Sequence, residues 1–174
     1  MKTKILFIII VSLMFSPAYA VTFSGGNLPF DSSFHLGLVN GPGTGISIGG
    51  EIYYPTGIFS LGGELEQQVT NADLEQNLNI LKYGLVLRYL FSNDIFFTFS
   101  LGAASFYITN ALNYTDSFGK QQSFDEDTHG TANYLAFAPN FRFSGYIFTP
   151  KLVVNNINDG GTIVELDLNI GAKF

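Results

Sequence analysis

A cluster of acids between residues 109 and 131 is the part of the sequence with the clearest capacity for chemistry. It contains Asp116, Asp125, Glu126 and Asp127. Carboxylates gathered in this way could bind Ca²⁺, which prefers oxygen ligands, but the spacing of an EF-hand loop is absent. A solvated acidic loop is the simpler interpretation, and we therefore predict no metal site.

Two histidines raise the question of nucleophilic catalysis. His35 belongs to an alternating segment, Ser47 and Ser60 could share its face of a sheet, and His129 lies in the acidic stretch. A reactive serine needs a histidine within hydrogen-bond reach. No His-x-Ser motif, Gly-rich phosphate loop or metal-ligand spacing accompanies these residues. We therefore expect no catalytic residues, no cofactor and no enzyme activity.

The elements that position these side chains are predicted to be β-strands. Apolar residues alternate with small or polar ones, which is the period of a strand whose successive side chains point to opposite faces. Eight such segments follow one another, each about 8–14 residues long, as transmembrane strands are. They span approximately residues 33–40, 45–54, 58–69, 79–91, 95–108, 132–143, 147–155 and 162–174.

Charged residues within these segments fall on the face opposite to the apolar ones. In the last segment, Val164, Leu166 and Leu168 share one face, and Glu165 and Asp167 share the other. The full set holds five acids and five bases: Glu51, Glu64, Glu66, Glu165, Asp167, Lys82, Arg88, Arg142, Lys151 and Lys173. Matched signs on one inner face predict a network of interior ion pairs and not a wide charged pore.

The N-terminus has the pattern of a secretion signal. Lys2 and Lys4 precede an apolar run over residues 5–15, and residues 18–20 read Ala-Tyr-Ala, a cleavage pattern. We predict a signal peptide over residues 1–20 and a single domain over residues 21–174. An uncleaved anchor is the alternative, although the apolar run is short for a bilayer.

Composition and connections indicate that the outer face meets lipid. Charged residues make up 13% of the chain, against about 25% in soluble domains. Three connections are tight (residues 55–57, 92–94 and 144–146), and the other four are longer (41–44, 70–78, 109–131 and 156–161). Outer-membrane barrels combine an even strand number with short periplasmic turns. We predict an all-β, eight-stranded antiparallel transmembrane up-and-down β-barrel with both termini in the periplasm; a soluble lipocalin-type barrel is the alternative.

The closing segment carries a resemblance to a known family. Its alternating apolar residues, including Leu168 and Ile170, end in a C-terminal Phe174. This ending resembles the signal by which the bacterial barrel-assembly machinery recognises its substrates, and a chain of this length resembles the small OmpA/OmpX-type outer-membrane barrels. The resemblance implies an outer-membrane location and contacts with membrane lipid, lipopolysaccharide and the assembly machinery. No basic patch indicates binding to nucleic acid.

The function that we expect is that of a structural or surface-interaction protein in the cell envelope. Its longer connections hold seven acids against one base, Lys120, and such a surface favours a basic partner. These acids are Asp73, Glu75, Asp116, Asp125, Glu126, Asp127 and Asp159. A narrow channel for small or apolar solutes and a lipid A-modifying enzyme are the alternatives.

Two prolines within the expected strands bear on the channel alternative. Pro139 and Pro150 fall in neighbouring segments, and each lacks the N–H that a strand ladder needs. They would mark a lateral gap or local bulges, and bulges are the favoured interpretation.

Overall fold

The computed structural model describes residues 30–41, 43–71, 77–109, 112–125, 127–158 and 161–173. Within them, no helix is both long and apolar enough to span a membrane. The predicted signal peptide over residues 1–20 lies outside the described residues, as do Asp73, Glu75, Glu126, Asp159 and Phe174.

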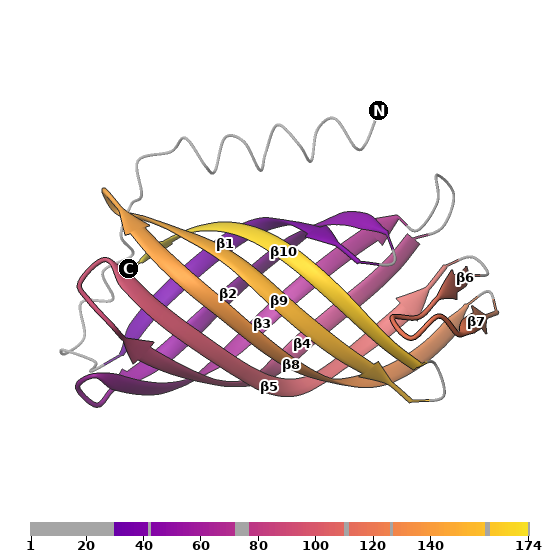
Figure 1. Ribbon diagram of the computed structural model, residues 1–174, viewed down its shortest axis with the longest axis horizontal. Coiled ribbons are helices and arrows are strands. Elements are labelled where there is room, and N and C mark those ends of the chain that lie inside the picture. The colour runs from indigo at the N-terminus through magenta and orange to yellow at the C-terminus, as the bar shows by residue number, and fades with distance from the viewer. Residues whose placement is uncertain are drawn as a thin grey trace.

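Eight strands form one closed antiparallel barrel, which confirms the predicted fold (Figure 1). Their order around the wall is β1-β10-β9-β8-β5-β4-β3-β2, and β1 pairs with both β10 and β2 to close it. The barrel strands are β1 (Asp31–Asn40), β2 (Thr44–Pro55), β3 (Phe59–Asn71), β4 (Asn77–Leu90), β5 (Ile95–Ile108), β8 (Thr128–Phe143), β9 (Tyr146–Ile157) and β10 (Gly161–Lys173).

The longest connection contains structure that the sequence did not predict. Strands β6 (Leu112–Thr115) and β7 (Gln121–Phe124) pair as a two-stranded hairpin, which projects from one end of the barrel (Figure 1). Strand β8 also begins at Thr128, four residues before the expected start at residue 132. Four-residue strands are too short for their alternation to stand out from a polar loop, and this explains the miss.

The tight connections lie together at the opposite end. Ser144 and Gly145 join β8 to β9 with φ angles of 45° and 90°. Two consecutive positive φ angles are those of a type I′ turn, whose twist matches that of the strands it joins. By the rule that periplasmic turns are short, this end faces the periplasm and the β6–β7 hairpin faces outward.

The exterior of the wall is apolar and the interior holds the charges. Leu85, Leu101 and Leu135 point outward from neighbouring strands and are 57%, 58% and 64% exposed. Leu168 and Ile170 of the proposed assembly signal also face outward from β10. Buried charged side chains face inward, so the distribution is the inverse of that in a soluble lipocalin-type barrel, and that alternative is excluded.

The prolines mark a gap in the ladder between β8 and β9. Paired positions run from Ala132↔Ile157 to Phe137↔Leu152, and they resume at Phe141↔Phe148. Because the register is the same on both sides, no extra residue is inserted, and the expectation of bulges is wrong. Inside the barrel, Thr149 Oγ1 donates to Asn140 Oδ1 at 2.6 Å, and Asn140 Nδ2 donates to the Ala138 carbonyl at 2.9 Å. The Thr149–Asn140 hydrogen bond thus joins β9 to β8 across the gap, whereas the Asn140–Ala138 contact stays within β8.

Candidate functional site: the barrel lumen and the outer hairpin

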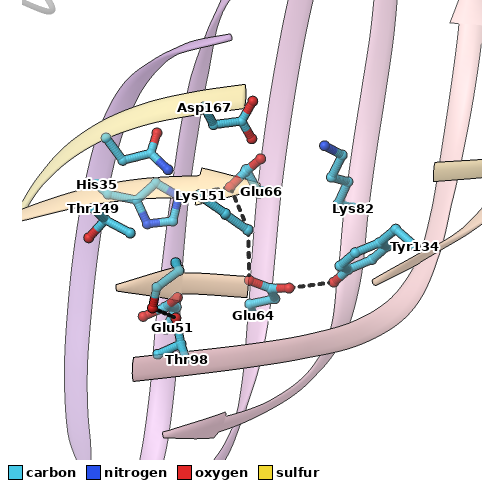
Figure 2. A network of polar contacts seen from close by, with 12 residues as sticks. His35, Glu51, Glu64, Glu66, Lys82, Thr98, Tyr134, Thr149, Lys151 and Asp167 are labelled. Carbon is cyan, nitrogen blue, oxygen red and sulfur yellow. Dashed lines mark hydrogen bonds and ion pairs between the residues drawn. The ribbon is translucent and has the colours of Figure 1, made fainter. Parts of the chain in front are cut away.

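The centre of the lumen is occupied by one lysine between two glutamates (Figure 2). Lys151 Nζ lies 3.0 Å from Glu64 Oε2 and 3.1 Å from Glu66 Oε2. The three side chains come from β9 and β3, and none of them is more than 5% exposed. His35 on β1 adds a fourth member, since its Nε2 lies 3.1 Å from Glu66 Oε2. The contacts therefore cross the barrel and tie opposite walls together.

Four further contacts extend this network toward the outer end. Tyr134 on β8 donates its hydroxyl to Glu64 Oε1 at 2.6 Å. Lys82 Nζ pairs with Glu165 Oε2 at 2.6 Å, with both side chains buried. Gln68 Nε2 donates to Glu66 Oε1 at 2.7 Å and to Asp167 Oδ2 at 3.1 Å. An eight-stranded barrel is just wide enough for side chains to fill it, and these contacts fill its middle.

The remaining predicted members of the ion-pair set lie nearer the periplasmic end. The Arg88 guanidinium carbon lies 3.5 Å from the centroid of the Tyr53 ring, and Arg88 Nη1 lies 3.4 Å from Asp31 Oδ2. Glu51 Oε2 accepts hydrogen bonds from Tyr53 and from Ser33 Oγ. The predicted network is thus divided, because Arg88 and Glu51 contact different partners from those of Lys151.

Of the remaining predicted bases, Arg142 contacts a backbone carbonyl and no acid among the described residues. Arg142 Nη1 donates to the backbone carbonyl of Asn93 at 3.0 Å, so it binds the β4–β5 turn at the rim. The side chain of Lys173 lies outside the described part of the chain. The alternation along a strand correctly places a residue on the inner face of the barrel. Its position along the barrel axis decides which partner it contacts.

Tyr134 reaches Glu64 because glycines face it from the wall. A Cβ atom at Gly84 would lie 2.5 Å from the Tyr134 hydroxyl, and one at Gly102 would lie 2.8 Å from its ring. Gly84 and Gly102 are directly paired across β4 and β5. Tyr134 was not predicted as a member of the network, although the alternation along the sixth expected strand places it on the inner face.

The serines and histidines considered for catalysis contact different partners in the described structure. His35 contacts Glu66, whereas Ser47 Oγ donates to Asn169 Oδ1 at 3.1 Å. Ser60 is buried on β3 opposite Arg88. His129 stacks on Tyr107 near the outer end, with ring centroids 4.5 Å apart. Among the described residues, no group of three or more His, Asp or Glu side chains is arranged so that it could hold a metal ion.

Asp116 organises the turn of the outer hairpin. Its Oδ1 accepts hydrogen bonds from the N–H groups of Lys120 at 2.8 Å and Phe118 at 3.0 Å. The residue is only 7% exposed, so this carboxylate is a structural part of the hairpin and not a free surface charge. Ser117 attaches the hairpin to the barrel, because its N–H donates to the Thr162 carbonyl and its Oγ accepts from the Val164 N–H, both at 2.9 Å.

The other described acids of the cluster remain on the surface. Asp125 and Asp127 are both exposed. Asp127 has a φ of 57° and accepts a hydrogen bond from the Tyr107 hydroxyl at 2.6 Å. Glu126 lies outside the described residues. The acidic cluster therefore has two parts, with Asp116 inside the hairpin and Asp125 and Asp127 where the chain returns to β8.

Acidification is expected to loosen the hairpin only at low pH. The backbone N–H of Lys120, with that of Phe118, holds the pKa of the Asp116 carboxyl below its ordinary value. A depressed pKa contributes stability that is present above the unfolded-state pKa, about 4, and is lost as the pH falls through the folded-state pKa. Exchange of the Phe118 and Lys120 amide protons, referenced to unstructured peptides, should stay slow down to about pH 4 and accelerate below it. In Asp116→Ala, which lacks the acceptor oxygen, exchange should be fast throughout; slow exchange in that variant would contradict the assigned role.

The sequence matches no known protein-family model, and no curated protein matches it either. Solved structures do share the fold. The N-terminal β-barrel domain of Pseudomonas aeruginosa OprF is 15% identical, with a TM-score of 0.55 over 83% of this chain and 97% of that one. A major outer membrane protein from Thermus thermophilus is 12% identical, with a TM-score of 0.57 over 83% of this chain and 99% of that one.

A third similar structure is that of Ail, the attachment invasion locus protein of Yersinia pestis, in complex with the heparin analogue sucrose octasulfate. It is 10% identical, with a TM-score of 0.51 over 83% of this chain and 96% of that one. At these identities the likeness concerns the fold alone. A closed eight-stranded wall with an apolar exterior is the architecture of a bacterial outer-membrane β-barrel, and it places the chain in that membrane.

Proposed function

We propose that this chain, a small outer-membrane barrel of the OmpA/OmpX type, is a surface-interaction protein that presents its β6–β7 hairpin to a protein partner. The observation that carries the proposal is Phe118 at the hairpin turn, which is 83% exposed. Aromatic residues on ordered elements are the usual anchors of protein interfaces. Asp116 and Ser117 fix the turn that carries this ring, so binding would cost little ordering entropy.

Charge supports a basic partner. Asp125 and Asp127 are exposed on the same connection as Phe118, and Lys120 is the only base between residues 109 and 131. This surface differs from one that would bind a polyanion, the class of ligand in the Ail complex. We therefore propose a protein partner that offers an apolar pocket for Phe118, with basic residues around the pocket. We also propose that this surface contacts lipopolysaccharide only through bridging cations.

Attachment assays on cells that display the chain test this proposal. Cells with wild-type protein are expected to attach to a surface coated with a basic globular protein and not to one coated with heparin. Phe118→Ser should lower attachment affinity at least about tenfold, the effect of losing an interface anchor. Gln121→Ala, an exposed position on the same hairpin, is the matched control and should bind as wild type. If cells with Phe118→Ser attached as strongly as cells with wild-type protein, at the same surface abundance, the proposal would be wrong.

We also propose that the barrel acts without catalysis and without conducting solutes. The hydrogen bond of Ser47 Oγ to Asn169, and not to His35, and the side chains that fill the middle of the lumen support this view. Lipid A from cells with and without the gene is then expected to carry the same acyl chains by mass spectrometry. A lost or gained acyl chain would instead support the enzyme alternative. Insertion by the barrel-assembly machinery through Leu168, Ile170 and Phe174 stays a prediction.

A further inference from the structure

Inward side chains at the outer end of the barrel are buried, although they lie at the ends of their strands. Ile108 is the last residue of β5, Ile157 is the last of β9, and Leu78 is the second of β4. They are 1%, 8% and 5% exposed. Side chains that face an open mouth would be exposed to outer water, so the outer end of the lumen is covered. The cavity that they line is about 20 Å³, which has room for about one water molecule.

The β6–β7 hairpin lies at this end of the barrel (Figure 1). It leaves the wall between β5 and β8, yet its turn contacts β10. The Ser117 N–H donates to the Thr162 carbonyl, and Ser117 Oγ accepts from the Val164 N–H. Because β9 lies between β8 and β10 in the wall, the hairpin must pass the end of β9 to make these contacts.

Ser117 binds β10 along an edge that none of the described strands occupies. The pairing of β1 with β10 ends at Asn40↔Leu166, so residues 161–165 of β10 extend beyond the end of β1. Thr162 and Val164 belong to this extension. Ser117 therefore takes the place beside β10 that residues of β1 hold nearer the periplasmic end.

The hairpin lies over the lumen and not against the outside of the wall. Gly161 of β10 is paired with Ile157, whose side chain lines the lumen, and directly paired residues share a face. A Cβ atom at Gly161 would collide with the Asp116 carboxylate and would lie 2.8 Å from Gln122 Nε2. Asp116 and Gln122 of the hairpin thus contact the inward face of β10.

We propose that the β6–β7 hairpin is a lid on the outer mouth of the lumen and that Ser117 is its latch on β10. Release of the two Ser117 hydrogen bonds lets the hairpin move away and admits water to the buried apolar side chains beneath it. The wall itself stays closed, because the pairing between β1 and β10 does not involve the hairpin. This role goes beyond the proposed surface function, in which the hairpin presents Phe118.

Cysteine labelling tests the lid, because the chain contains no cysteine of its own. Ile163→Cys places a thiol on the buried inner face of β10, and Ile108→Cys on β5 is a second buried reporter. Thr115→Cys places a thiol on the exposed part of the hairpin. In the refolded barrel in detergent micelles, a cationic methanethiosulfonate reagent should label both buried reporters much more slowly than Thr115→Cys. Equal rates would mean that the mouth is open and would overturn the inference.

Ser117→Pro removes both latch hydrogen bonds and is compatible with the turn. The Gly119 N–H donates to the Asp116 carbonyl at 2.9 Å, which places Ser117 at the second position of a β-turn, where proline is favoured. In Ser117→Pro, the buried reporters should be labelled about tenfold faster or more, the effect of losing two hydrogen bonds of ordinary net strength. Gly161→Ala, whose added Cβ displaces the hairpin from the side of the wall, should also raise the rate.

Gln121→Ala changes an exposed position on the same hairpin and is the matched control, in which labelling should stay slow. Labelling should also stay slow in Phe118→Ser, which separates the lid from the proposed partner site. Every variant should keep the gel shift between folded and boiled protein, because the wall is intact. Faster labelling in either Ser117→Pro or Gly161→Ala, with the gel shift kept, supports the lid. Unchanged labelling or a lost gel shift in both variants would overturn it.

Discussion

Replacement of Lys151 by methionine is expected to lower the free energy of unfolding by about 3–5 kcal/mol, the effect of removing one partner of a buried charge pair. Lys151 is the shared partner of Glu64 and Glu66, and all three are buried at the barrel centre. Methionine keeps the volume but leaves two carboxylates close together in a medium that solvates them poorly. His35 and Tyr134 contact these carboxylates but do not replace the lost ammonium.

Urea unfolding of the refolded barrel in detergent, followed by tyrosine fluorescence and by the gel shift between folded and boiled protein, measures this change. Lys151→Met/Glu64→Gln/Glu66→Gln should recover most of the lost stability, because it removes the unpaired charges together. Lys120→Met, at an exposed position on the hairpin, is the matched control and should change stability by less than about 0.5 kcal/mol. A single variant as stable as wild type would show that the lumen tolerates the two charges.

Leu85→Arg tests the other face of the wall and should destabilise the barrel by about 2–4 kcal/mol. Leu85 lies near the middle of β4 and is 57% exposed on the outer face. If that face meets hydrocarbon, a guanidinium there loses its hydration without gaining a partner. The same urea titration in lipid vesicles gives the magnitude. Gln121→Arg, beyond the membrane on the hairpin, is the control. A loss below about 1 kcal/mol at Leu85 would argue against lipid contact.

The barrel could be predicted from the sequence because its main signal is local. Alternation tells the inward face from the outward one within each strand, and the tight turns fix which neighbours pair. The alternation of inward and outward side chains was enough to assign Lys151, Glu64 and Glu165 to the lumen. The outer hairpin was missed because β6 and β7 span only four residues each.

Contacts inside the lumen could not be predicted, because they depend on the stagger of strands around the closed wall. Lys151 and Glu64 are 87 positions apart in the chain and meet across the barrel. Arg142 has the same inward parity, yet it lies at the rim and binds a turn carbonyl. The cluster of buried apolar side chains that includes Ile80, Phe106 and Ile157 was not predicted either. Strand alternation places these residues and Lys82 on the inner face alike, and it does not distinguish positions along the barrel axis.

The break in the β8–β9 ladder makes the wall unevenly stiff. From Ala138 to Asn140 the two strands have no paired positions, and Asn140 and Thr149 span the interval from inside. Every other neighbouring pair around the barrel has an unbroken ladder over the paired length. A pulling force applied across the wall would therefore separate β8 from β9 before any other pair of strands. The tear would begin in the periplasmic half of the bilayer, while the outer end that carries the hairpin stayed closed.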